Sequence, residues 1–451
     1  MATIVIQFGL FPAGKSEQDL CTLPKQKFTF MKRMALNFIC KNEAHVISNM
    51  LTSVRPIADL IVAVDTGSTD DTVKLIEQFG TQNNIPTYVS ARPFDNFSNS
   101  RNFALDELLK TVECLGWNLE ETWGFWIDCD EHIVFSSKFE KNKIDQDLYL
   151  AKTWADSDSY SKQLFFRLSK GFRWVGPIHE IMEWADDVQI KIDVVKGINI
   201  IYERTGASWK GDLVEKFLDY ARILEDYVNN GNNNFRWTFV IGDSYQAAAE
   251  FCKDSTKRTH ILRSAKQSYE IAFSLCCTRS DQYICLYKIA EVKTKLNYDW
   301  QNIEKVLLKA HEMDPSRAEC INRIIEHYIE TNDWLGTYKY TDYAVNSFHG
   351  KSPVGLSHFC LDGSLYEWRL LYFHYLACQH CNRKKDASVA FKQLKYILQY
   401  PNEYLKEKDR LKILATSPLI LNLRSMFSNI VNPIRRAFAK TIPSLNSTFN
   451  H

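Results

Sequence analysis

Residues 60–72 of this 451-residue chain read LIVAVDTGSTDDT, an apolar, β-branched run that ends in an acidic turn containing a glycine. The run predicts a buried strand, and residues 68–71 (STDD) supply candidate caps for a helix that follows it. A second apolar run lies at 34–40, and the stretch between the two, at 44–54, has helical periodicity. Two strands joined by a helix form a βαβ unit, which predicts a parallel sheet.

The alternation of short strands and helices continues beyond this unit. We expect a helix at 70–79, a strand at 87–90, a helix at 98–115 and strands at 124–127, 148–154, 163–169 and 189–202. The last three predict a smaller, partly antiparallel lobe, because glycines and a proline interrupt them. The fold class is therefore α/β, followed by an all-α domain. The expected boundaries are an N-terminal extension at 1–33, the α/β domain at 34–210, the helical domain at 211–430 and a tail at 431–451.

The helical half contains an internal repeat with an offset of 38 residues: Ala265, Tyr269 and Ala272 recur as Ile303, Leu307 and Ala310. Small residues where helices cross, with a large residue one turn away, resemble the tetratricopeptide helix pair. An irregular helical bundle is the alternative. Tetratricopeptide-like repeats hold peptides or partner proteins, so this domain is also where a homo-oligomer would form.

The composition excludes several classes of protein. With 45% hydrophobic residues the chain can bury a core, and 55 basic against 54 acidic residues leave a net charge of +1, which favours no nucleic-acid partner. No run of about 18 apolar residues predicts a membrane span, and no basic leader precedes residue 14, so we expect a cytoplasmic protein. The twelve cysteines then predict reduced thiols; Cys378 and Cys381 form a CxxC that fits packed helical thiols better than zinc.

Acidic residues follow three of the predicted strands. Glu43 comes after the first strand, Asp65 ends the second, and Asp128 and Asp130 follow the tryptophan-rich strand at 124–127. In a parallel sheet these carboxyl ends meet at one edge, where ligands bind. Gathered carboxylates are costly without a cation. Paired aspartates separated by one residue can hold Mg²⁺ or Mn²⁺ completed by phosphates, although an isolated pair is more often a solvated turn.

Five ordered segments resemble the family two glycosyltransferases of the GT-A fold, the nucleotide-diphospho-sugar transferases. They are residues 40–43 (CKNE), 64–72 (VDTGSTDDT), 97–104 (FSNSRNFA), 126–131 (WIDCDE) and 174–180 (WVGPIHE). The resemblance covers about residues 34–205, and the last segment is similar to one in the subgroup that carries a helical repeat domain. Cys129 departs from the pattern, because a small apolar residue is usual there.

The resemblance implies a role for each candidate residue. The substrate-binding candidates are Asn42, Glu43, Asp65, Arg101 and Asp128; the candidate ligands of the divalent metal are Asp128, Asp130 and His179; the catalytic candidates are Glu180 and Glu131. Three residues have plain structural alternatives: Asp65 as a turn-forming acid, Arg101 in a surface ion pair, and His179 as a structural residue in a turn. Asn102 is expected to cap its helix or brace the acidic turn.

The implied reaction is a metal-dependent, inverting transfer of a sugar from a nucleotide diphosphate, with UDP-sugar as the expected donor. Glu180 is preferred as the base over Glu131 and Asp156. The acceptor is open, with a polypeptide or a glycan favoured by the neighbouring helical domain. Two rival interpretations are another Mg²⁺-dependent phosphate-transfer enzyme and an interaction scaffold that carries a degenerate transferase domain.

Overall fold

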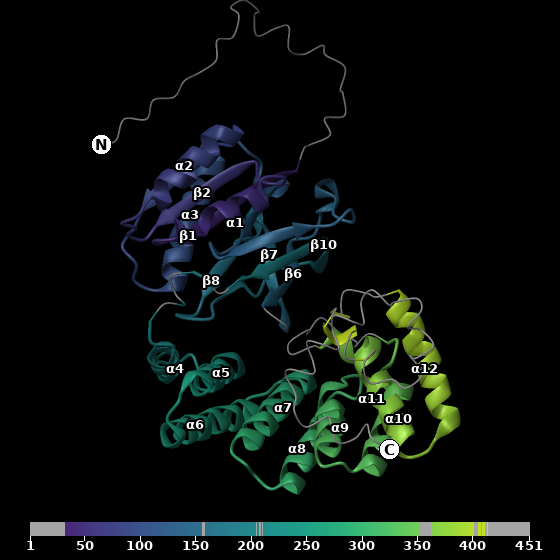
Figure 1. The fold of residues 1–451 in the computed structure, drawn as a ribbon. Helices are drawn as coiled ribbons and strands as arrows, with labels where there is room; N and C mark the ends of the chain where they lie inside the picture. The colour runs from purple at the N-terminus through teal and green to yellow at the C-terminus, as the bar shows by residue number, and fades with distance from the viewer. Residues whose placement is uncertain are drawn as a thin grey trace, which may run out of the picture.

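An α/β domain with a mixed sheet precedes a helical domain in the computed structural model, which confirms the predicted fold class (Figure 1). The structure describes residues 32–155, 158–203, 205–206, 209, 211–351, 362–400, 405–406, 408–410 and 413. Almost all of the expected N-terminal extension, the expected tail and Asp156 lie outside the described residues.

The α/β domain is built on an eight-stranded sheet in the order β3-β2-β1-β4-β7-β6-β10-β5. Its first four strands are parallel: β1 pairs with β2 and β4, and β2 with β3. These strands are β1 (Arg33–Cys40), β2 (Leu60–Asp65), β3 (Thr87–Ala91) and β4 (Thr122–Trp126). The chain runs outward from β1 to β3 and then returns to β4 on the other side of β1. The order of strands therefore reverses between β1 and β4, where such sheets bind ligands.

Three helices connect the parallel strands: α1 (Ile47–Val54), α2 (Thr72–Asn83) and α3 (Phe97–Cys114). The amphipathic spacing of α1 places Ile47, Met50, Leu51 and Val54 in the core. Asp71 precedes α2 but makes no capping bond; Asp70 instead accepts the backbone N–H of Thr72 (3.1 Å) and of Ala44 (3.2 Å). Asp70 thus joins the turn after β2 to the turn after β1.

The smaller, partly antiparallel lobe expected after residue 131 is present, and it is continuous with the parallel sheet. The strands β5 (Glu131–Phe135), β6 (Leu148–Ala155), β7 (Asp158–Arg167) and β10 (Ile192–Tyr202) extend the same sheet. The reason is that β7 pairs antiparallel with β4, with Phe125 opposite Phe165 in the shared core. A separate hairpin of β8 (Arg173–Val175) and β9 (Ile181–Glu183) follows β7; neither strand was expected, and nor was β5.

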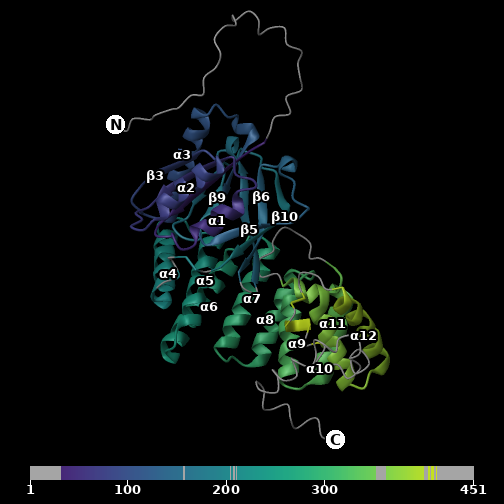
Figure 2. The same ribbon diagram turned by 45° about the horizontal axis from the view of Figure 1, so that its top comes forward.

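The helical domain runs from α4 to α12. Its helices are α4 (Leu213–Asn229), α5 (Phe235–Phe251), α6 (Ser255–Ser274), α7 (Arg279–Lys295), α8 (Trp300–Met313), α9 (Glu319–Glu330), α10 (Trp334–Phe348), α11 (Leu370–His380) and α12 (Lys384–Gln399). Figure 2 shows them following one another in chain order, from α4 beside the α/β domain to α12 at the far end. All six residues of the 38-residue repeat are buried, at equivalent places on α6 and α8. The repeat therefore marks helix positions that pack alike.

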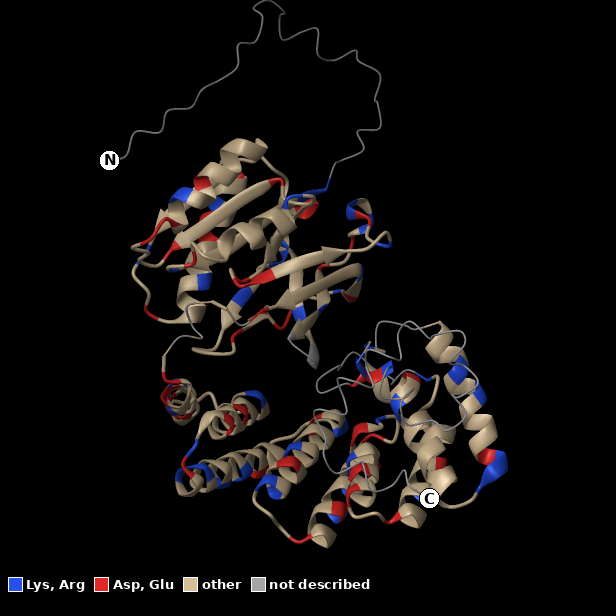
Figure 3. Cartoon of the chain, in the orientation of Figure 1, with Lys and Arg blue, Asp and Glu red and all other residues tan. Residues whose placement is uncertain are grey.

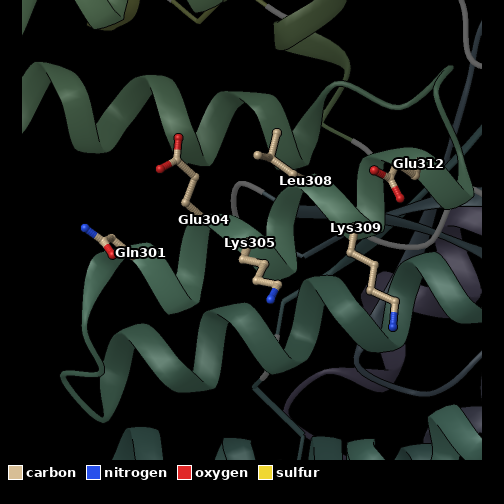
Figure 4. Close-up of a pocket in the computed structure, with 6 residues that line it drawn as sticks. All are labelled: Gln301, Glu304, Lys305, Leu308, Lys309 and Glu312. Atoms are coloured by element: carbon tan, nitrogen blue, oxygen red, sulfur yellow. The ribbon is translucent and has the colours of Figure 1, made fainter.

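Two further features of the helical domain lie away from the strand ends. A hollow of about 500 Å³ runs along α8, lined by Gln301, Glu304, Lys305, Leu308, Lys309 and Glu312 (Figure 4). Cys378 is buried against His374 (3.5 Å), and the Cys381 thiol donates to the carbonyl of Trp334 (3.2 Å), which fits packed thiols. No helix among the described residues is long and apolar enough to cross a membrane.

The two domains meet where α4 and α5 pack on the β8–β9 hairpin. Trp237 of α5 is buried in a small apolar cluster with Ala221 and Leu224 of α4, and Val175 and Ile181 of the hairpin pack against it. The indole lies directly on the backbone of Gly176, where a Cβ atom would stand 2.1 Å from it. Gly176 also has φ +97°, a conformation that glycine adopts at little cost.

We expect Gly176→Ala to destabilise the protein by about 3 kcal/mol or more, because the methyl group meets Trp237 and the backbone disfavours a side chain. The matched control is Gly171→Ala, where φ is +67° but nothing lies within 4 Å of the added Cβ. This control should cost about 1 kcal/mol. If both variants lose the same free energy of unfolding in urea, the contact between Gly176 and Trp237 does not contribute to stability.

Candidate active site

The candidate residues gather at the carboxyl ends of β2, β1 and β4, which are neighbours in the sheet. Asn42 and Glu43 follow β1, Asp65 ends β2, and Asp128 and Asp130 follow β4. Segments coloured for Asp and Glu lie along the edge of the α/β domain that faces α4 and α5 (Figure 3). The parallel sheet thus brings these residues to one edge, as the sequence predicts.

Arg101, near the start of α3, forms the centre of the site. Its guanidinium lies 3.1 Å from Oδ1 of Asp128 and 2.5 Å from Oε1 of Glu180, and packs over the rings of Trp126 (4.4 Å) and Trp174 (4.9 Å). Burial alone would lower the pKa of Arg101, but Asp128 and Glu180 outweigh it and raise that pKa. The side chains of Arg101 and Glu180 are buried, so the alternative of a surface ion pair for Arg101 was wrong, and its phosphate-binding role stays a prediction.

Lys162 of β7 supplies a second cation that sequence reasoning missed. Its Nζ lies 2.8 Å from Oδ2 of Asp128 and 2.6 Å from Oε2 of Glu131, whose side chain is 2% exposed. Trp126 also donates its indole N–H to Oδ1 of Asp128 (3.0 Å). Burial opposes ionisation of Asp128, yet Arg101 and Lys162 hold its pKa well below the ordinary 3.8. No local motif marks Lys162; only the pairing of β7 with β4 brings it here.

The surroundings of Asp130 shift its pKa in the opposite direction to that of Asp128. Burial, and then the charge of Asp128, raise its pKa from 3.8 to about 6, while the backbone N–H of Gly206 donates to its Oδ2 (3.2 Å) and opposes the rise. A Cβ atom on Gly206 would stand 2.6 Å from that oxygen, so the glycine lets the loop after β10 approach. A cation beside Asp130 would offset the repulsion that raises its pKa.

The turns after β1 and β2 are joined by hydrogen bonds. Oδ1 of Asn42, which has φ +57°, accepts the N–H of Thr69 (2.8 Å), and the N–H of Asn42 donates to the hydroxyl of Ser68 (3.0 Å). Asp65 accepts the backbone N–H groups of Gly67 (3.2 Å) and Ser68 (3.1 Å). Asp65 therefore stabilises the turn after β2, which was the structural alternative for this residue. Its role in binding the nucleotide base stays a prediction.

The loop between β8 and β9 carries His179 and Glu180. His179 has φ +54°, and its carbonyl accepts a hydrogen bond from Arg236 of α5 (2.9 Å). Asn102 does not cap its helix: its amide donates to the carbonyl of Trp174 (2.8 Å) and its carbonyl accepts the Trp174 N–H (2.8 Å). The loop is thus held from α3 on one side and from α5 on the other.

Among the described residues, no group of three or more His, Cys, Asp and Glu side chains is arranged to hold a metal ion. The residues present nevertheless fit a cation completed by phosphates, since Mg²⁺ and Mn²⁺ bind nucleotide substrates through one or two carboxylates. Asp130 fits this use best, because both oxygens of Asp128 already contact cationic side chains. Two hollows of the structure, one along α8 and one beside Asp147, lie away from these residues.

Comparisons with known proteins give short matches to proteins named as glycosyltransferases. No protein-family model matches the sequence. An "Uncharacterized glycosyltransferase" from Rickettsia felis is 33% identical over 125 residues, which are 27% of this chain and 38% of the relative. A relative of similar name from Rickettsia prowazekii is 30% identical over 125 residues, 27% of this chain and 37% of its own length. The chain therefore matches well under half the length of these curated relatives.

Solved structures show two further similarities. S. aureus TarS 1-349 in complex with UDP is 12% identical, over 72% of this chain and 95% of that one, with a TM-score of 0.30. MamA is 12% identical, over 43% of this chain and 94% of that one, with a TM-score of 0.29. TM-scores this low do not establish a shared fold.

We expect Arg101→Met to lower the free energy of unfolding by about 3–5 kcal/mol. The substitution leaves the buried Glu180 without its cationic partner, and it removes one of the two cations that pair with Asp128. The matched control is Arg173→Met, whose partner Asp106 lies 2.7 Å away with both side chains about half exposed (50% and 46%). That pair should contribute less than about 1 kcal/mol. Similar losses for both variants in urea unfolding would contradict the central role of Arg101.

Asp130→Asn should stabilise the protein at pH 7. The native pKa of about 6 exceeds the ordinary 3.8, so the native state loses stability as the pH rises from about 4 to above 6. Asparagine does not ionise and so avoids that loss. The pKa shift corresponds to at most about 3 kcal/mol of unfolding free energy, and we expect a gain of about 1–2 kcal/mol because the side chain is partly exposed. Thermal melting at pH 4 and pH 7 tests this. The gain should vanish at pH 4 and be absent in the exposed control Asp186→Asn.

Proposed function

We propose that this chain is a glycosyltransferase that moves a sugar from a nucleotide diphosphate, specifically a UDP-sugar, to an acceptor. The observation that carries the proposal is the pairing of Asp128 with Arg101 and Lys162 at the point where the strand order reverses. Asp130 lies two residues further along the chain, and its raised pKa of about 6 is what a nearby cation would lower. The two curated relatives named as glycosyltransferases support it.

Each residue of the site takes a distinct role in this proposal. Asp130, with His179, would hold a Mn²⁺ or Mg²⁺ ion, and that ion would supply positive charge to the diphosphate. Asp128 is oriented by its two cationic partners and binds the ribose of the donor, because its oxygens are too fully engaged to serve chiefly the metal. Asp65 and the turn formed with Asn42 hold the base.

The reaction we propose is a single displacement with inversion. The acceptor oxygen forms a bond to the anomeric carbon, the bond to the diphosphate oxygen breaks, and that oxygen keeps the electron pair. The acceptor proton passes to Glu180. Glu131 is the weaker candidate for the base, because its side chain is 2% exposed and accepts both Lys162 (2.6 Å) and the N–H of Asp128 (2.9 Å).

The acceptor class follows from the neighbouring helices. The paired helices from α4 onward begin beside the site and extend away from it, so they would hold a long acceptor, a polypeptide or a glycan. The same domain would form the contact in a homo-oligomer. A panel of nucleotide sugars, assayed for slow hydrolysis with Mn²⁺, would identify the donor without an acceptor. Absence of any nucleotide binding would favour the scaffold alternative.

We expect Asp130→Ala to lower donor hydrolysis at least about 100-fold, since it removes the carboxylate that would hold the metal ion and with it the positive charge that the ion would supply to the diphosphate. Glu180→Gln should lower transfer by about 10²–10⁴-fold with little change in the donor KM, as loss of a general base does. If Glu180 instead only positions Arg101, the donor KM will rise as well. Glu140→Gln, a change at an exposed acid, serves as the control and should leave both steps unchanged.

A further inference from the structure

Helix α12, at the end of the helical domain that lies far from the α/β domain, has one side in the core and one side in solvent (Figure 2). Ala387, Ala390, Leu394 and Leu398 are buried in a cluster with residues of α11. The side chains on the opposite side recur every three or four residues and are exposed. They form what we call the α12 face: Lys385, Val389, Lys392, Lys395, Tyr396 and Tyr400.

The α12 face exposes large apolar side chains. Val389, Tyr396 and Tyr400 are 57%, 67% and 61% exposed, and the rings of the two tyrosines lie 5.1 Å apart. Among the described residues, only Leu335 has another large apolar side chain that is more than half exposed. Neighbouring apolar side chains left in solvent mark a surface that binds a partner.

The lysines of the α12 face have no matching acids. Lys385, Lys392 and Lys395 form no ion pair or hydrogen bond with any described residue. The one acid of the helix, Asp386, is partly buried and accepts a hydrogen bond from the hydroxyl of Tyr338 on α10 (3.1 Å). Segments coloured for Lys and Arg accordingly recur along α12 in Figure 3. The face therefore combines charge of a single sign with apolar side chains.

Helix α8 shows that exposed lysines alone do not produce such a face. Lys305 and Lys309 are exposed there, but Glu304 and Glu312 line the same hollow (Figure 4). The charges along α8 are therefore balanced, whereas those on the α12 face are not.

We propose that the α12 face docks on an anionic lipid surface. The lysines would meet the negative headgroups, each strengthening binding about fivefold, while the tyrosine rings and Val389 would sit at the level of the headgroups. A nucleic acid would match the lysines, but its phosphate backbone would leave the apolar side chains between them in water. The inference is independent of the proposed function, because it concerns the end of the helical domain and not the strand ends.

The sequence beyond α12 has charge of the same sign. Residues 414–451 contain four Arg or Lys and no Asp or Glu. They lie outside the described residues, so the inference rests on α12 itself.

The test is sedimentation of the full chain with vesicles of phosphatidylcholine that contain about 30% phosphatidylserine, compared with vesicles of phosphatidylcholine alone. Binding to the anionic vesicles should be at least about tenfold stronger, and it should weaken as the salt concentration rises from about 0.1 to 0.5 M. The double variant Lys385→Gln, Lys392→Gln should weaken this binding at least about tenfold. The double variant Tyr396→Ser, Tyr400→Ser should weaken it about fivefold or more and leave its salt dependence unchanged.

The double variant Lys305→Gln, Lys309→Gln is the matched control. It removes the same charge from exposed positions of α8, and it should bind the anionic vesicles as the wild type does. Melting curves establish that each variant folds. If Lys385→Gln, Lys392→Gln does not fold, Lys392→Gln, Lys395→Gln takes its place with the same expected loss.

Several results would overturn the inference. The wild type fails to bind the anionic vesicles, or it binds neutral vesicles equally well. The α8 control loses as much binding as the lysine variant of α12, or neither α12 variant loses any, which would assign binding to another part of the chain. Binding of an RNA or DNA duplex without vesicle binding, or self-association in ultracentrifugation that the tyrosine variant abolishes, would assign the face to that partner instead.

Discussion

The ion pairs of Arg101 with Asp128 and Glu180 are the constraint on which the site depends. They join three segments that are distant in the sequence: α3, the end of β4 and the loop after β8. A buried charge without a partner costs several kcal/mol, so none of the three segments can move without the others. Because Asn102 of α3 also pairs with the backbone of Trp174 in β8, that helix holds both the charge of the loop and the strand that leads into it.

The charge balance of the cluster agrees with the ligand-binding role that we propose for it. Asp128 is held ionised by two cations, whereas the pKa of Asp130 is raised to about 6 by burial and by Asp128. Adjacent carboxylates with such different surroundings commonly occur where a protein binds a charged ligand. The strain at Asp130 is a cost that the large apolar core of the sheet can offset.

The helical domain helps to hold the loop that carries two of the candidate site residues. Trp237 of α5 packs on Gly176, and Arg236 donates to the carbonyl of His179, so the loop that carries His179 and Glu180 is held from the helical side. His179 has a left-handed backbone conformation, which a non-glycine residue adopts only when its surroundings hold it. The position of Glu180 therefore depends on α5 as well as on its partner Arg101.

The sequence by itself determined the order of strands and helices up to residue 131 and the set of acids at the strand ends. Apolar runs and helical spacing mark these elements locally, and the carboxyl ends of parallel strands must share one edge. Asp65, Asp128 and Asp130 were therefore placed correctly. The 38-residue repeat likewise marked buried positions of α6 and α8, because helices that pack alike repeat their small and large residues.

Only the tertiary structure decided how the acids are neutralised. Lys162 reaches Asp128 across 34 residues of sequence because β7 pairs antiparallel with β4, and that register depends on core packing between the strands. The same pairing makes the expected smaller, partly antiparallel lobe continuous with the parallel sheet. Glu180 reaches Arg101 from the loop between β8 and β9. Such contacts follow from how distant surfaces fit together, for which no local spacing in the sequence codes.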